Sequence, residues 1–448
     1  MIAFILPLLA AASLSLSAQE EPATPAAPAA PAAPATLSLT IDQAVDYALD
    51  NNRNVASARY DVLASEKGVW EAVAAGLPAV GGSASITDNL EVMTRIIDFG
   101  GTPTAFKFGT QYDASIGVSA STLIYNASWL VGIQTAKLAA TMAGQGLTLT
   151  TIETKENVIN IYHLILTLKE TLSIIDQNLE NLNEILASTR AMFSVGMAEA
   201  TDVDQMQSNV TMLVNSRSSM LRSLEVNYNM LRFMLGVSID TEINLTDTLD
   251  DVLEKINVET LVSEEFKIED NINYKLIESQ LMMSELSLKS ARVTTLPSLA
   301  GTYYYNSNGM GDEIAHMQYF PNSAVALQLQ VPIFASGLRS AQINRAKINL
   351  EKAQNEKSMI SEQLLLQERQ LRYNLLNANE QFKSQKSNIE IARRVVESFE
   401  NKYSQGVASS LDLTQANNNY LTAQNNYISA LINLLQTKVA FDKLMNKL

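Results

Sequence analysis

The sequence contains no cysteine among its 448 residues. Disulfides, thiolate metal sites and cysteine nucleophiles are therefore excluded, and we expect no lipidated amino-terminal cysteine of the bacterial lipoprotein kind. Histidine is almost as scarce. His163 lies in an apolar helical stretch and is interpreted as a packing residue, whereas His316 is expected to be exposed in a loop over 307–321. Glycine-rich phosphate loops and G-x-S-x-G motifs are also missing. We therefore expect no catalytic residue, no cofactor and no metal site.

Charge is scarce as well, and positive charge is in the minority. Charged residues make up 18% of the chain, with 47 Asp and Glu against 32 Lys and Arg, for a net charge of −15. Because no basic stripe is available to meet phosphates, we expect no nucleic-acid partner. Hydrophobic residues reach 47%, so the chain has enough apolar surface to fold.

The amino-terminal segment has the pattern of an export signal. Residues 2–16 are almost wholly apolar and small residues follow, so we predict a signal peptide over 1–19. A transmembrane anchor over the same residues is the alternative. Residues 20–36 repeat Pro and Ala, which favours an extended linker. Beyond this signal the sequence has no further apolar run long enough to span a bilayer, so a membrane-embedded part would have to be a β-barrel.

The rest of the chain is internally duplicated. Residues 193–236 align without a gap on 403–446, and Gly196 and Asp202 fall on Gly406 and Asp412. A second pair of matching segments opens the two halves at a larger offset, so the first half carries the longer insertion.

These matches predict the organisation of the exported chain. We place the insertion in 88–110, and we expect the middle segment to form an acidic belt with a short helix near 249–256. The predicted units are a first structural repeat over 37–238, a belt segment over 239–271 and a second structural repeat over 272–448.

Four segments of the duplicated region alternate apolar residues with small or polar ones, as β-strands with two unlike faces do. In the last of them, Val325, Leu327 and Leu329 are separated by Ala and Gln. An uncharged alternation of this kind fits a sheet with lipid on one face and water on the other. Because four strands cannot close a channel, oligomerisation would have to complete the barrel. The predicted strands are 80–88, 113–124, 298–306 and 322–333.

Two long segments, 126–192 and 336–402, contain no Pro and are dominated by helix formers. Each would be roughly 100 Å long as one helix, which is longer than a compact soluble core requires. The segment after each one carries apolar residues at alternating steps of three and four, as at Leu413, Ala416 and Tyr420. We therefore predict one antiparallel coiled-coil hairpin in each half.

The turns of these hairpins are FSVGMAEATD and YSQGVASSLD. The Gly in each turn is placed to end the long helix in the left-handed conformation. Asp202 and Asp412 are expected to be the N-caps of the following helices, with Gln205 and Gln415 as the third residues of capping boxes. The same carboxylates could also narrow the end of a helical tunnel.

The order of these features resembles the TolC-like outer membrane efflux protein family. The resemblance runs from Leu37 to Leu448, and it rests on LSLTIDQAVDYALDNNRNV, two Leu-Pro strand entries, VPIFASGLRSAQINRAK and the duplicated tips. It implies an α+β fold in which three chains form one outer membrane β-barrel of twelve strands, four from each chain. This barrel would continue into a long periplasmic α-helical coiled-coil barrel.

The resemblance also implies function and partners. The protein would be the passive outer membrane channel of a tripartite efflux or type I secretion system in a Gram-negative bacterium. Its implied partners are two further copies, a periplasmic adaptor (membrane fusion) protein, an inner-membrane pump and outer membrane lipid. The adaptor would dock on the hairpin tips at Ser194, Val195, Gly196, Ser404, Gln405 and Gly406.

The periplasmic gate of the family maps onto Asp202, Tyr403, Asp412 and Gln415. A Tyr of the second hairpin binds an Asp of the first in closed family members, which would pair Tyr403 with Asp202. The latch Arg position holds Ala408 here, so that link is absent. Gln415 replaces one of two constricting carboxylates, which leaves one ring of Asp412 carboxylates to favour cations.

Two other classes of protein remain open from the residues alone. One is a periplasmic coiled-coil scaffold or adaptor without a channel, although an adaptor would carry one hairpin and a β-rich half. The other is a secreted enzyme, which would need a polar constellation in a pocket. The sequence does not specify whether the cargo is a drug, a metal or a protein.

Overall fold

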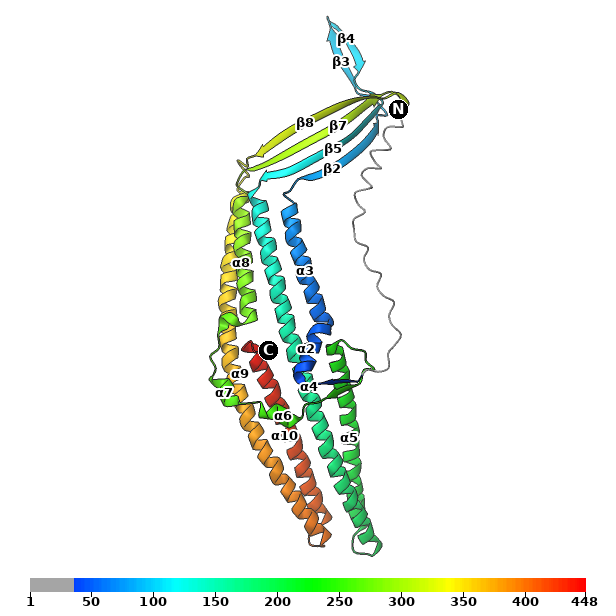
Figure 1. Ribbon diagram of the computed structural model, residues 1–448, viewed down its shortest axis with the longest axis vertical. Helices are drawn as coiled ribbons and strands as arrows, with labels where there is room; N and C mark the ends of the chain where they lie inside the picture. Colours follow the sequence, from blue (N-terminus) through cyan, green and yellow to red (C-terminus); the bar gives the residue numbers. More distant parts are fainter. Residues whose placement is uncertain (1–35) are drawn as a thin grey trace.

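The computed structural model describes residues 36–448; the predicted signal peptide and all but the last residue of the Pro/Ala segment lie outside the described residues. The chain is elongated, with a β-sheet near one end, two helical hairpins at the other and a belt between them (Figure 1). The long helices connect the sheet to the hairpin tips without a break.

The two halves repeat one order of elements. The first half consists of β1 (Leu37–Leu39), α2 (Ile41–Asn51), α3 (Arg53–Ala74), β2 (Ala79–Asp88), β3 (Thr94–Phe99), β4 (Thr102–Lys107), β5 (Tyr112–Tyr125), α4 (Ala127–Ser194) and α5 (Ala200–Leu235). The belt consists of β6 (Ile243–Leu245), α6 (Leu249–Glu254), α7 (Val258–Ser263) and the 3₁₀ turn η2 (Ile268–Asp270). The second half consists of α8 (Ile272–Val293), β7 (Ser298–Gly311), the 3₁₀ turn η3 (Ile314–His316), β8 (Gln318–Gln330), α9 (Leu338–Ser404) and α10 (Ser410–Leu444).

The predicted helices and strands are largely confirmed. The helices α4 and α9 run unbroken for 68 and 67 residues, and each is followed by its hairpin partner. The short belt helix α6 lies where it was expected. The insertion at 88–110 was placed correctly, but its strands β3 and β4 were missed, and they form a hairpin beyond the sheet. The expected loop over 307–321 is wrong in extent, because β7 and β8 continue into it and leave only residues 312–317 between them.

The four-stranded sheet is antiparallel, with the order β2-β5-β7-β8. Its register places most apolar residues of the four strands on one face, as in the aligned pair of Tyr303 with Val325, whereas Met310 and Phe320 lie on the other face. The other face carries small and polar residues, such as Ser115, whose hydroxyl bonds the Asn308 side chain at 2.9 Å. The apolar face is exposed, since no other described element covers it.

Each half builds one column of the helical body from two helices stacked end to end. Asn52 begins α3: its side-chain oxygen accepts the N–H of Asn54 at 2.8 Å, and its side-chain N–H donates to the Met234 carbonyl near the end of α5 at 2.7 Å. Asn271 does the same in the second half, with Asn273 at 2.9 Å and the Leu444 carbonyl of α10 at 3.1 Å. Both asparagines are buried. This duplicated joint satisfies the groups that two helix ends would leave unpaired.

The main hydrophobic core lies at the belt, where α2, α4, α5, α9, α10 and the short parallel pair β1-β6 meet. The buried Tyr162 of α4 fixes this region, because its hydroxyl bonds the Leu39 carbonyl at 3.0 Å and Asp247 at 2.9 Å. Burial and Asp247 together raise the pKa of Tyr162 above its usual value. Among the described residues, α4 is the one helix long and apolar enough to cross a membrane, and 56% of its most apolar window is buried within the protein, as in a core helix.

Candidate functional site at the hairpin tips

Both hairpin tips have the same backbone. Gly196 has φ of 80° and Gly406 has φ of 72°, so each occupies the left-handed region that ends a helix. The N–H of Met197 donates to the Met192 carbonyl at 2.8 Å, and that of Val407 donates to the Lys402 carbonyl at 2.8 Å. These bonds are the Schellman pattern, and they satisfy the last carbonyls of α4 and α9.

The capping prediction for the following helices is wrong by three residues. The N-caps are Glu199 and Ser409, and Asp202 and Asp412 occupy the third helical position. Each carboxylate reaches back to the N–H of its N-cap residue, at 2.9 Å for Asp202 and 3.1 Å for Asp412. The helices therefore start three residues earlier than predicted, with Asp at the N3 position, where a capping box usually has Glu or Gln.

The two hairpins are joined near their tips by uncharged donors. The Tyr403 hydroxyl of α9 lies 2.8 Å from the Thr189 hydroxyl of α4, and both side chains are buried. The hydrogen of Thr189 is already donated to the Ile185 carbonyl at 2.9 Å, so Tyr403 must be the donor. The Ser410 hydroxyl donates to Asp202. Deeper in the bundle the Asn209 side chain donates to Thr414 at 3.2 Å.

The predicted gate residues thus lie near the hairpin tips, but the expected pair of Tyr403 with Asp202 does not form among the described residues. Tyr403 does not bond Asp202 within the described chain; each has a different partner on the opposite hairpin. Asp412 is exposed and is bonded by the hydroxyl of Ser409 at 2.7 Å, and the side-chain and backbone donors of Ser409 lower the pKa of Asp412. Gln415 lies on the next turn, where it donates to Asn419 at 3.0 Å.

The predicted docking residues lie at the extreme ends of the hairpins, and all six are exposed. The structure adds apolar neighbours that the prediction missed. Met197, Val407 and Leu411 are each at least 71% exposed. Apolar side chains in short turns between two helices are the sequence signal that could have identified them.

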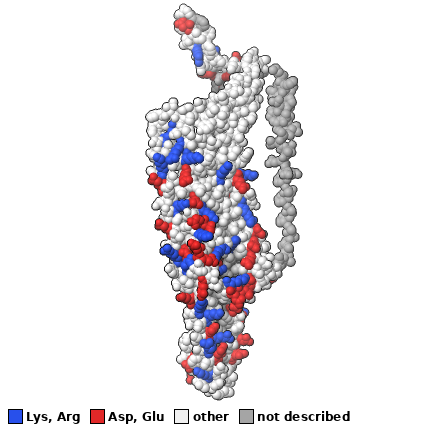
Figure 2. Space-filling view, turned by 60° about the vertical axis from the view of Figure 1, so that its left-hand side comes forward, with Lys and Arg blue, Asp and Glu red and all other residues white. Residues whose placement is uncertain are grey.

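The second functional feature is the four-stranded sheet, which carries almost no charged side chains. Figure 2 shows Lys, Arg, Asp and Glu spread over the helical body, whereas the sheet below the β3-β4 hairpin is almost free of charge. Of the residues in β2, β5, β7 and β8, only Asp88 and Asp113 are charged. Both lie at the end of the sheet next to the β3-β4 hairpin, where they occupy neighbouring positions of the paired strands β2 and β5. An uncharged band with one apolar face is the surface that hydrocarbon requires.

The described residues offer no group of three or more His, Asp or Glu side chains placed to hold a metal ion. His163 is buried, as expected for a packing residue, and His316 is exposed, as expected. Burial and the nearby Lys438 lower the pKa of His163 to about 4, so its imidazole is neutral near pH 7.

The sequence matches the model of the family described as "Outer membrane efflux protein" over residues 44–237 and 278–447. The chain therefore belongs to the outer membrane efflux protein family. A comparison with curated proteins gave no match. The family places the chain in the outer membrane of a Gram-negative bacterium, with a large periplasmic portion, and the chain is not an enzyme.

Solved structures share this fold at low sequence identity. The chain is similar to the outer membrane protein VceC of Vibrio cholerae, with a TM-score of 0.71, 13% identity, and coverage of 90% of this chain and 95% of that one. It is similar to the CmeC outer membrane channel of Campylobacter jejuni, with a TM-score of 0.71 and 16% identity. That match covers 91% of this chain and 85% of CmeC. It is also similar to CusC, a protein described in terms of transmembrane channel formation, with a TM-score of 0.74 and 15% identity. That match covers 95% of this chain and 98% of CusC. The predicted fold class is thereby confirmed, including the four strands of each chain, the long hairpins and the duplication.

Proposed function

We propose that this outer membrane efflux channel is the passive exit duct of a tripartite efflux or type I secretion system, assembled from three copies of the chain. The observation that carries the proposal is the four-stranded sheet, which is continuous with two helical hairpins and whose two edges and apolar face are left uncovered by residues 36–448. The predicted units 37–238, 239–271 and 272–448 are part of this proposal. The chain has no catalytic step to perform, so an inner-membrane pump supplies the energy.

Closure of the barrel follows from hydrogen-bonding needs. The outer edges of β2 and β8 have no partner strand among the described residues. Unpaired backbone groups are costly in lipid, and exposed edges invite pairing with another chain. When β8 of one copy pairs with β2 of the next, three sheets close into one barrel of twelve strands. The apolar face then meets lipid, and the small and polar face lines a water-filled lumen.

The tips are proposed to be both gate and docking site. The hydrogen bonds donated by the uncharged hydroxyls of Tyr403 and Ser410 hold the two hairpins of a copy together in a closed tip, and the exposed Asp412 carboxylates form an acidic ring at the mouth. Gln415 lies one turn farther inside. A ring of carboxylates favours cations and repels anions.

The docking part of the proposal concerns the exposed tip residues Ser194, Val195, Gly196, Ser404, Gln405 and Gly406. Their apolar neighbours Met197, Val407 and Leu411 extend the same surface. Large exposed apolar side chains on a folded protein are typical of an interaction site. A periplasmic adaptor that presents apolar side chains would cover this surface and carry the channel to its pump.

The test is planar-bilayer conductance of the detergent-purified protein, with the mass of the oligomer measured first. Trimers that give small, stable, cation-selective channels would support the duct with an acidic tip. A water-soluble protein with no conductance would overturn the proposal and favour a periplasmic coiled-coil scaffold. Trimers that conduct anions and cations equally would keep the barrel but remove the Asp412 ring from the gate.

A further inference from the structure

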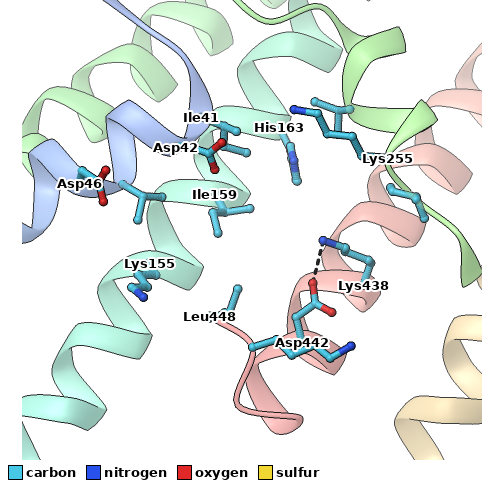
Figure 3. A pocket seen from close by; sticks show the side chains of 14 residues that line it. Ile41, Asp42, Asp46, Lys155, Ile159, His163, Lys255, Lys438, Asp442 and Leu448 are labelled. Atoms are coloured by element: carbon cyan, nitrogen blue, oxygen red, sulfur yellow. Dashed lines mark ion pairs between the residues drawn. The ribbon is translucent and has the colours of Figure 1, made fainter. Parts of the chain in front are cut away.

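A pocket of about 430 Å³ lies at the belt, and its lining contains none of the predicted gate or docking residues (Figure 3). It is lined by α2, α4, α6 and α10, so it joins the first half of the chain, the belt and the second half. Its volume is within the range of small-molecule sites in proteins. Part of its wall is apolar, with Ile41, Ile159 and Val252.

Two deeply buried polar atoms of this pocket have no hydrogen-bond partner among the described residues. They are Nδ1 of His163 and Oδ1 of Asp442, on side chains that belong to residues only 6% exposed. The great majority of buried polar atoms in folded proteins are bonded, so each such atom calls for an explanation. Oδ1 of Asp442 needs a hydrogen-bond donor, whereas Nδ1 of the neutral His163 imidazole can carry a hydrogen and donate it.

The charges around these atoms define the kind of ligand. Lys438 forms an ion pair with the other oxygen of Asp442 at 2.7 Å, and its charge also acts on His163. Lys155 lies on the same face of α4 as Ile159 and His163, at steps of four, and has no ion-pair partner among the described residues. The lining therefore combines the neutral His163 and the Lys438–Asp442 ion pair with the additional ammonium of Lys155 (Figure 3), whereas the side chains of Asp42 and Asp46 are exposed.

We propose that the belt pocket binds a small hydroxylated organic anion. Its carboxylate accepts hydrogen bonds from Nδ1–H of His163 and from the Lys438 ammonium, and its hydroxyl donates to Oδ1 of Asp442. Its apolar body lies against Ile159. The ammonium of Lys155, two turns before His163 on α4, attracts the ligand's negative charge. Because the pocket walls come from both repeats, a bound ligand ties α4 to α10 above the hairpins.

The probe is mandelate, which carries a carboxylate, a hydroxyl and a phenyl ring. The sequence has only two histidines, so histidine-labelled trimers in amphipol give two imidazole signals by NMR, and the exposed His316 is an internal control. Mandelate should shift the His163 signal saturably and leave the His316 signal in place. No saturable shift of His163 would overturn the proposal.

Matched probes and variants separate the parts of the site by calorimetry. Phenethylammonium, with the opposite charge, should not bind, and phenylacetate, without the hydroxyl, should bind more weakly than mandelate. Lys438→Gln should weaken mandelate binding roughly tenfold or more, because it removes a charge-assisted hydrogen bond. Lys443→Gln is the control: Lys443 lies on the same helix, is 30% exposed against 28% for Lys438, and pairs with Glu156 at 2.7 Å outside the pocket.

Each result has a definite meaning. Equal weakening by Lys438→Gln and Lys443→Gln, or binding of phenethylammonium as tight as that of mandelate, would overturn the anion site. Equal binding of phenylacetate and mandelate would overturn the hydroxyl contact to Asp442. Channel conductance of each variant is unaffected by this inference, so failure here leaves the proposed duct standing.

Discussion

Removal of the Tyr403 hydroxyl is expected to open the periplasmic tip. In Tyr403→Phe the hydrogen bond to Thr189 is lost, but Thr189 keeps its bond to the Ile185 carbonyl, so no polar group of the pair is left buried and unbonded. The loss is then the net value of one neutral hydrogen bond, about 1 kcal/mol in each copy. In a concerted threefold gate this amounts to about 3 kcal/mol, or roughly a hundredfold shift toward the open tip.

Single-channel recording measures this shift as open probability. The control is Tyr420→Phe, because Tyr420 is a half-buried tyrosine of α10 whose hydroxyl makes no hydrogen bond to any other described residue. The Phe variant at 403 should open far more often than the wild type, and the variant at 420 should match the wild type. An unchanged open probability at 403, in trimers of normal mass, would refute the reasoning that this bond holds the gate closed.

Three further predictions concern the tip charge, the joints and the turns. Because Ser409 lowers the pKa of Asp412, the carboxylate should stay charged, and the channel cation-selective, as the pH falls to the ordinary aspartate pKa of about 3.9; Ser409→Ala should lose selectivity at a higher pH, and reversal potentials across a pH series check this. Asn271→Ala and Asn52→Ala should each weaken a helix joint by about 2 kcal/mol through the lost cap and the unpaired carbonyl, with faster amide exchange at the facing helix ends. Gly406→Val should impair efflux, because a β-branched residue is strained at its φ of 72°; Gly406→Asn should retain much more activity in the same complementation assay, and equal activity of both variants would remove the turn from docking.

The local patterns of the sequence predicted the elements well because each depends on neighbouring residues. Alternation over a few positions identified the four strands, and the absence of Pro over long stretches identified α4 and α9. The capping prediction failed at Asp202 and Asp412, since a carboxylate fits both the N-cap and the N3 position, and only the position of the preceding turn distinguishes them. The strands β3 and β4 were missed because a two-stranded hairpin is short and carries no core-facing run.

The class of this protein follows from sequence patterns alone: an exported, duplicated chain with uncharged alternating strands and helices too long for a compact core. Which polar groups meet depends on how the hairpins pack. Tyr403 and Thr189 are 214 residues apart, and Ser410 and Asp202 are 208 apart. Periodicity specifies the face on which a side chain lies but not its partner on another helix, because that partner depends on the register between packed hairpins. The tip bonds, the asparagine joints and the belt pocket all arise from that register.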